Sequence, residues 1–176
     1  MSTLRLELAV TIRPCREDDL PGMEWFGRFA DHRQIIRDAF DLQQAGLAVM
    51  LLAEANHHPV GQAWLDLRPR PAAVGPMVWA VRVLEPLQGL GIGARLMAGI
   101  EAAARQRGHA AVELGVDRDN AAARAFYERL GWRVFRQRRD SYGYTTPDGR
   151  TVVVPLEEWV MAKRIDQPAG VSPTRA

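Results

Sequence analysis

The feature that most constrains the fold is a glycine-rich loop near the middle of the chain. From Gln88 to Ala94 it reads Gln-Gly-Leu-Gly-Ile-Gly-Ala, after an apolar run over 77–84 and before an amphipathic stretch over 94–107. Glycine permits a sharp turn and a close approach of backbone to ligand, and the first amides of a helix have no partner within it. Such a strand–loop–helix unit suits a phosphate or pyrophosphate. The loop therefore predicts an α/β protein that binds a phosphate-bearing ligand.

The same glycines also fit a dinucleotide-binding fingerprint. Gly89, Gly91 and Ala94 match the G-x-G-x-x-G/A pattern. Glu113 lies about 20 residues further on, where a ribose-binding acid would sit. Two features oppose this interpretation, because residues 85–88 separate the strand from the glycines and too little chain follows to complete a doubly wound sheet. A nicotinamide cofactor is therefore the weaker alternative.

The rest of the chain alternates segments typical of strands and of helices. Strands are expected at 6–12, closed by Pro14, and at 47–55, 60–67, 77–84, 111–116, 132–138 and 159–165. Helices are expected to begin at Asp18 and to cover 31–44, 94–107 and 120–130. This order predicts a mixed sheet with helices on its faces. We expect residues 1–165 to form a single domain and residues 166–176 to form a flexible tail.

Composition narrows the class of protein further. The chain has 176 residues, 47% of them hydrophobic, which is enough for a sizeable core. A run of about 18 apolar residues is missing, which excludes a membrane-spanning helix, and the first residues lack the layout of a signal peptide. We therefore expect a cytoplasmic protein. The single Cys15 excludes an internal disulfide and a cysteine-based zinc cluster, and no metal is expected.

The charge pattern argues against a nucleic-acid binder. The chain carries 23 lysines and arginines against 21 acids, a formal net charge of +2, and Lys163 is its only lysine. The basic stretch from Arg136 to Arg139 is followed at once by Asp140. Binding of DNA phosphates would need a denser basic stripe, so we expect no nucleic-acid partner.

Two motifs carry a resemblance to a known family. Gln88-x-x-Gly91-x-Gly93 is similar to the Q/R-x-x-G-x-G/A pyrophosphate loop of the GNAT superfamily of N-acetyltransferases. Residues 120–132 resemble that family's N-x-x-A-x-x-x-Y-x-x-x-G-F segment, with tryptophan as the last residue. The motifs stand in the family's order, and the resemblance covers roughly residues 6–165. It implies a mostly antiparallel central sheet that contains a splayed parallel strand pair and is flanked by helices.

The resemblance implies acetyl-CoA as cosubstrate and points to the residues that bind it. One strand would pair its backbone with the pantetheine arm, and the loop amides would hold the pyrophosphate. The strand residues are Val81, Arg82 and Val83, and the loop residues are Gln88, Gly89, Leu90, Gly91, Ile92, Gly93 and Ala94. Asn120 matches the family asparagine that contacts the cofactor. Tyr127 matches the family tyrosine that protonates the leaving thiolate.

The general base does not follow from these two motifs. The ribosomal-protein alanine acetyltransferase branch carries a glutamate five residues before the asparagine, where this chain has Gly115. Glu113 lies two residues earlier and so faces the same side of the strand. Glu113 is therefore the predicted base, acting directly or through a water molecule, and Glu85, His57 and His58 are weaker candidates.

The acceptor pocket of this family lies between the first helices and the last hairpin. Acids beside aromatic rings suit a cationic amine. The candidates are Trp25, Phe26, Asp31, Asp38, Asp140, Tyr142, Tyr144 and Asp148. We expect acetyl transfer to a primary amine of a small molecule or peptide, through a tetrahedral intermediate, and leave a homodimer open. The alternative is a non-catalytic GNAT-like module that binds acyl-CoA.

Overall fold

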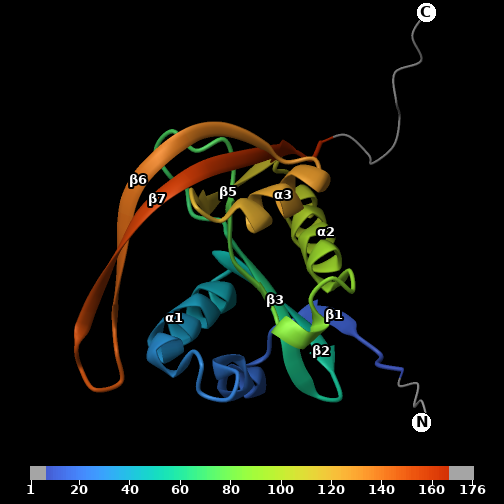
Figure 1. Cartoon of the computed structure of the whole chain (residues 1–176), viewed down its shortest axis with the longest axis vertical. Coiled ribbons are helices and arrows are strands. Elements are labelled where there is room, and N and C mark those ends of the chain that lie inside the picture. The colour runs from blue at the N-terminus through green and yellow to red at the C-terminus, as the bar shows by residue number, and fades with distance from the viewer. Residues whose placement is uncertain (1–6, 167–176) are drawn as a thin grey trace, which may run out of the picture.

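The protein is built around a twisted, mostly antiparallel sheet (Figure 1). The computed structural model describes residues 7–166. The sheet has seven strands in the order β1-β2-β3-β4-β5-β7-β6. They are β1 (Thr11–Pro14), β2 (Ala48–Ala55), β3 (His58–Asp66), β4 (Met77–Val83), β5 (Ala111–Asp117), β6 (Arg133–Thr145) and β7 (Thr151–Arg164). Only β4 and β5 run parallel to each other, so the expected mixed sheet with one parallel pair is confirmed.

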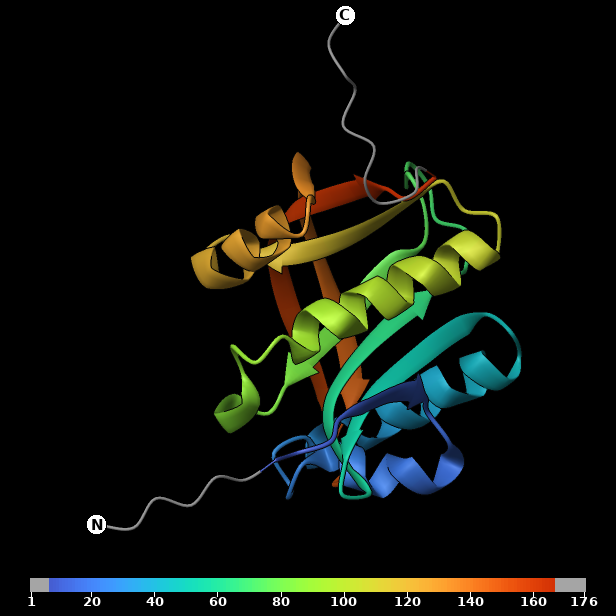
Figure 2. The ribbon, with the colours of Figure 1, turned by 90° about the vertical axis from the view of Figure 1, so that its right-hand side faces the viewer.

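Helices cover both faces of this sheet. They are α1 (Arg33–Gln44), α2 (Ile92–Gln106) and α3 (Ala121–Arg129), with three 3-10 turns at η1 (Glu17–Glu24), η2 (Ala30–His32) and η3 (Glu85–Leu87). Figure 2 looks onto the face that α2 crosses. In the described part of the chain no helix is long and apolar enough to cross a membrane.

Strand β2 shows why its sequence is continuously apolar. Val49 and Leu51 pack into the core under α2, whereas Met50 and Leu52 pack into a second core under α1. Successive side chains of a strand point to opposite faces, so a strand buried on both faces loses the polar half of its alternation. The two cores lie on opposite sides of the sheet and share it as a common wall.

The parallel pair separates after two residues. Only Met77 with Glu113 and Val78 with Leu114 are in register, and the strands then diverge (Figure 2). A β-bulge interrupts the pairing of β3 with β4, and Ala80 adopts φ 51° there. A bulge bends the strand that carries it, and a left-handed φ is uncommon for alanine. The bend at Ala80 therefore turns β4 away from β5 and opens the sheet.

The last two strands are longer than the sequence predicted. Strands were expected at 132–138 and 159–165, but β6 and β7 pair from Arg133 to the turn after Thr145, with one shift of register between Val134 and Arg136. Only the last part of β7 pairs with β5, so the rest of the hairpin extends beyond the sheet and reaches past α1 (Figure 1). Its side chains alternate between exposed and half-buried, a weaker pattern than the apolar strands of the core.

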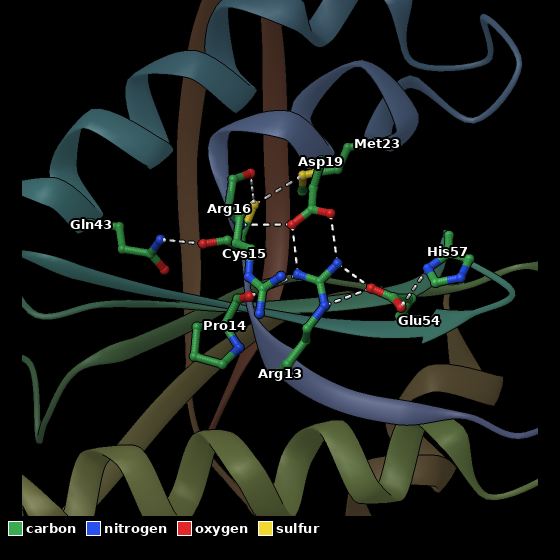
Figure 3. Close-up of polar contacts among 9 residues, drawn as sticks. All are labelled: Arg13, Pro14, Cys15, Arg16, Asp19, Met23, Gln43, Glu54 and His57. Atoms are coloured by element: carbon green, nitrogen blue, oxygen red, sulfur yellow. Dashed lines mark hydrogen bonds and ion pairs between the residues drawn. The ribbon is translucent and has the colours of Figure 1, made fainter.

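The first strand begins later than predicted. The expected strand at 6–12 starts outside the described residues, and β1 covers Thr11–Pro14, while Leu8 is 43% exposed. Arg13 fixes this position (Figure 3), because its guanidinium donates to both carboxylate oxygens of Asp19 at 2.7 Å and to Glu54 on β2. These bonds hold the pKa of the Asp19 carboxyl below its usual range. The predicted tail falls outside the described residues except for Asp166, which accepts hydrogen bonds from Arg164.

Candidate active site

The divergence of β4 and β5 opens a cavity of about 980 Å³. Its two walls are β4 from Met77 to Arg82 and β5 from Leu114 to Asp117. Helix α3 and the β6–β7 hairpin complete the lining. Beyond Val78 the β5-facing edge of β4 has no strand partner among the described residues. Backbone donors and acceptors on that edge are therefore free for an extended ligand.

The predicted cofactor strand lies along this cavity. Val81 and Arg82 line it, while Val83 comes just beyond the lining at the end of β4. The side-chain amide of Gln88 donates to the carbonyl of Val83 at 3.0 Å. This bond ties the start of the glycine loop to the end of the strand, so strand and loop form one continuous surface.

The glycine loop has the geometry of an anion site. Gly91 is the N-cap of α2, and Gly89 and Gly91 adopt φ 76° and 84°, where glycine is favoured. Within residues 7–166, no acceptor receives a hydrogen bond from the amides of residues 89–94. The helix dipole adds partial positive charge at the same place. The lack of a side chain at Gly93 also serves packing, because a Cβ there would lie 3.2 Å from the ring of Phe126.

Tyr127 reaches the cavity from α3. Its side chain packs against the rings of Phe126 and Trp132, and the residue is only 8% exposed. Burial raises the pKa of Tyr127 to about 12. The phenol therefore carries its proton at neutral pH and can donate it, but it does not supply an anion.

Asn120 stands at the start of α3 and also lines the cavity. Its Oδ1 accepts a hydrogen bond from the amide of Ala123 at 3.0 Å, so the side chain caps the helix. The side-chain NH2 has no acceptor in the part of the chain that the structure describes. Asn120 therefore has both a structural bond and a free donor at the cavity.

Glu113 lies outside this cavity. Its carboxylate is fully buried, and Oε1 accepts a hydrogen bond from Arg70 at 3.1 Å and lies 3.5 Å from Arg136. Oε2 accepts a hydrogen bond from the amide of Val74 at 3.2 Å. Both oxygens are occupied, and Glu113 lines neither this cavity nor the one beside it. These surroundings suit the centre of an ion-pair cluster and give no support to the predicted role as base.

The structure brings to the cavity a carboxylate that sequence analysis missed. Glu158 on β7 is 8% exposed and lines the cavity wall. Arg138 on β6 donates to its Oε2 from Nε at 3.0 Å and from Nη2 at 2.5 Å. A Cβ built on Gly115 would lie 2.3 Å from Oε1 of Glu158. The glycine within the apolar strand was the available signal, since it marks a place that another group fills.

A second cavity of about 510 Å³ extends from this site toward α1. Its apolar walls include Ile35 and Ile36 of α1 and two tryptophans from β3 and β4. Among the predicted acceptor residues, Asp140 and Tyr142 line it. The others lie elsewhere: Trp25, Phe26, Asp31, Asp38, Tyr144 and Asp148. Residues that line both cavities are Met77, Trp79, Ala80, Arg82, Arg138, Tyr142, Leu156 and Glu158.

Arg82 lies where the two cavities meet and has no carboxylate partner among the described residues. Its guanidinium lies 4.1 Å from the centre of the Phe29 ring, a close cation–π contact. Burial lowers its pKa, and Tyr142 lies close to it. Of the acids predicted for the acceptor pocket, only Asp140 lines the second cavity, while Arg82 adds a positive charge where the two cavities meet.

Comparison with known proteins now decides the family. The model of the Acetyltransferase (GNAT) family matches residues 14–132. The chain belongs to the GNAT family. The match includes both the glycine loop and the Asn120–Tyr127 segment, and it leaves out the β6–β7 hairpin. No curated protein sequence matches this GNAT protein.

Solved structures agree with the GNAT fold. The Escherichia coli ribosomal-protein-S18-alanine N-acetyltransferase is similar at 22% identity and TM-score 0.66, over 92% of this chain and 97% of that one. The Salmonella typhimurium protein yncA, solved with its cofactor acetyl-CoA, is similar at 20% identity and TM-score 0.68, over 94% and 99%. The Thermoplasma acidophilum PaiA N-acetyltransferase, in complex with coenzyme A, is similar at 18% identity and TM-score 0.62, over 89% and 99%. The predicted GNAT fold is confirmed.

Proposed function

We propose that this GNAT protein transfers the acetyl group of acetyl-CoA to a primary amine of a small molecule or peptide. The observation that carries the proposal is the open edge of β4, which leads to a glycine loop with unpartnered amides. An extended chain that ends in a pyrophosphate fits this arrangement, since the edge offers backbone hydrogen bonds and the loop offers an anion site. The complexes of yncA with acetyl-CoA and of PaiA with coenzyme A support this choice of cosubstrate.

The thioester would lie between β4 and β5, near Tyr127. The amine attacks the thioester carbonyl, and a backbone amide at Val83 or a neighbour donates to the tetrahedral oxyanion. The thiolate then leaves, and the phenol of Tyr127 protonates it. The raised pKa of Tyr127 supports this role, because it keeps the proton on the phenol throughout the physiological range.

The acceptor would enter through the second cavity. That cavity meets the first one around Ala80 and Leu156, so an amine entering from the α1 side reaches the thioester without displacing the cofactor. The apolar walls would hold the carbon skeleton of the acceptor, and the polar groups at the junction would orient its nitrogen.

A binding and turnover experiment tests the proposal. Acetyl-CoA at about 100 times its dissociation constant should raise the free energy of unfolding by about 2.7 kcal/mol, and NADH should have no effect. A screen of amines and short peptides should then identify an acceptor that releases free thiol from acetyl-CoA. A melting shift with NADH and none with acetyl-CoA would overturn the proposal, and binding without thiol release would favour the non-catalytic module.

A glycine substitution tests the loop itself. Gly91→Glu should abolish acetyl-CoA binding, because its side chain occupies the anion site and adds a like charge. Gly108→Glu is the matched control, since Gly108 has φ 81° against 84° for Gly91 and ends α2 at the other side. The two variants should lose similar stability, and only Gly91→Glu should lose the cofactor. If Gly91→Glu binds acetyl-CoA with unchanged affinity, the pyrophosphate site lies elsewhere.

A further inference from the structure

We propose that Glu158 is the general base of the acetyl transfer and supplies from β7 the carboxylate that Gly115 lacks on β5. The inference rests on the proposed function and adds a residue to it. Its starting point is that the expected base, Glu113, has no free oxygen and no access to the cavity.

The carboxylate of Glu158 lies next to Gly115. Gly115 pairs with Val160 and Asp117 pairs with Glu158, so Glu158 lies diagonally opposite Gly115 on the neighbouring strand. A Cβ at residue 115 would lie 2.3 to 2.6 Å from the three carboxyl atoms of Glu158. A side chain at 115 and this placement of Glu158 therefore exclude each other, and the carboxylate occupies the space where a side chain from β5 would begin.

Arg138 holds only one of the two carboxylate oxygens of Glu158. Arg138 donates both of its hydrogen bonds to Oε2, and Oε1 receives no hydrogen bond from any residue that the structure describes. The arginine thus holds the carboxylate in one orientation and leaves the other oxygen to accept a proton. Glu158 is 8% exposed and lines the cavity, so its second oxygen can accept a hydrogen bond from a ligand there.

Glu158 lies where the two cavities meet. Glu158 lines the cavity proposed for the thioester and also the cavity proposed for the acceptor. A base must lie within hydrogen-bond reach of the nitrogen as it meets the thioester carbonyl. The junction of the two cavities is the place where both reactants come together.

The proton transfers balance with this assignment. Oε1 of Glu158 takes one proton from the ammonium, and the free amine forms a bond to the thioester carbonyl carbon. The carbon–sulfur bond then breaks, and the thiolate takes the phenol proton of Tyr127. The second nitrogen proton returns to the phenolate, and Glu158 releases its proton to solvent. One acetyl group is transferred, one thiol forms and one proton is released.

Other ionisable groups line the same two cavities as Glu158. They are His32, Asp66 from β3, Arg68 and Arg70 from the loop after it, Arg82 from β4, Asp117 from β5, Arg118 and Asp119 from the loop after it, Tyr127 from α3, Arg138, Asp140 and Tyr142 from β6, and Glu157 from β7. Burial lowers the pKa of His32 and raises those of both tyrosines. His32 therefore stays neutral and the tyrosines stay protonated between pH 7 and 9, which is the range for the test.

The test is the pH dependence of Glu158→Gln, measured with the full chain, acetyl-CoA and an acceptor from the thiol-release screen. At pH 7 the variant should lose about 10²-fold in kcat/KM for the acceptor, as expected when a general base is removed. The deficit should shrink as the pH approaches the pKa of the amine, because the acceptor then arrives already deprotonated. Binding of acetyl-CoA should be unchanged.

Glu101→Gln is the matched control. Glu101 is also 8% exposed and is also paired with a cation, since Lys163 donates to both of its oxygens at 2.8 Å, but it lines neither cavity. Its variant should share any loss of stability and keep the native pH profile. If Glu158→Gln keeps native kcat/KM, or if its deficit is constant with pH as in a merely structural lesion, Glu158 is not the base.

A second variant moves the carboxylate from β7 to β5. Glu158→Ala vacates the space over residue 115, and Gly115→Glu in that background returns a carboxylate from β5. The double variant should be at least about tenfold more active than Glu158→Ala alone. A double variant no more active than the single one contradicts the inference. In either case acetyl-CoA binding and thiol release by the unaltered protein report separately on the proposed function.

Discussion

Glu113 and Glu158 are buried carboxylates paired with arginines on strands of the same sheet, but their surroundings differ. Glu113 belongs to the closed end of the β4–β5 pair, where it is in register with Met77, and both of its oxygens accept hydrogen bonds. Glu158 lies beside the open end, opposite Asp117, and one of its oxygens is free. Burial and an ion pair therefore do not distinguish a reactive carboxylate from a structural one. The two residues differ in that Glu158 lines a cavity and has a carboxylate oxygen that accepts no hydrogen bond from the described residues.

The largest expected effect is on stability and comes from a substitution at the closed end of the β4–β5 pair, where the two strands are in register. Glu113→Ala should lower the free energy of unfolding by about 3 kcal/mol, because it leaves the guanidinium groups of Arg70 and Arg136 without their buried partner. Urea denaturation measures this loss. The folded variant should keep its kcat/KM within about threefold, since Glu113 does not line the cavity. Unchanged stability with a large loss of turnover would instead make Glu113 the base.

The next largest effect is on catalysis and comes from a substitution at the open end, where β4 and β5 diverge. Tyr127→Phe keeps the ring and its packing, so stability should hardly change. Loss of the phenol proton should lower kcat by about 10²-fold, equivalent to about 2.7 kcal/mol, without changing the affinity for acetyl-CoA. Steady-state kinetics from pH 7 to 10 should give parallel profiles for the two proteins, because burial puts the pKa of Tyr127 at about 12, outside that range. An unchanged kcat would reduce Tyr127 to a packing residue.

A third ion-pair cluster, around Arg13, extends the comparison. Arg13 binds Asp19 and Glu54, and none of the three lines either cavity, so this cluster resembles the one around Glu113. Asp19→Asn should cost about 1–2 kcal/mol at pH 7. Because Arg13 lowers the pKa of Asp19 in the folded protein, its contribution is complete above the unfolded value near 4 and is lost as the pH falls further.

The measurement is the free energy of unfolding from pH 7 to 2 for both proteins. Other carboxylates also lose their partners in acid, so the informative quantity is the difference between the two curves. That difference should narrow below about pH 4. A difference that stays constant across the whole range would show that the Asp19–Arg13 pair does not act through its charge.

The last prediction is that a thiol reagent does not modify Cys15 in the native protein. Cys15 is 4% exposed, its Sγ lies 3.6 Å from the Met23 sulfur, and burial raises its pKa to about 12. An alkylating thiol reagent at pH 8 should leave the native thiol unmodified and turnover unchanged, and it should react fully in denaturant. Rapid modification of the native protein would mean that the N-terminal region opens readily.

The sequence predicted the features that depend on short segments. The glycine loop and the Asn120–Tyr127 helix follow from local spacing, the parallel pair was implied by the family resemblance, and the fold agrees with all three. Glu158 could not be predicted in this way, because it meets Gly115 only through the register of β7 on β5, more than 40 positions away in the chain. The start of β1 was misplaced for a similar reason, since its first residue, Thr11, pairs with Glu54 near the end of β2.

The arginines of β6 have a consequence for how copies of this chain can meet. Strand β6 is the last of the sheet, and no strand within residues 7–166 pairs with its outer edge. An open edge of 13 residues invites a second chain to add alongside and begin an aggregate. Three of the four arginines from Arg133 to Arg139 form ion pairs with glutamates of this chain, Arg136 with Glu113, Arg138 with Glu158 and Arg139 with Glu157. Charged side chains along an edge strand make the addition of another strand less favourable, so this charge run protects the open edge from aggregation.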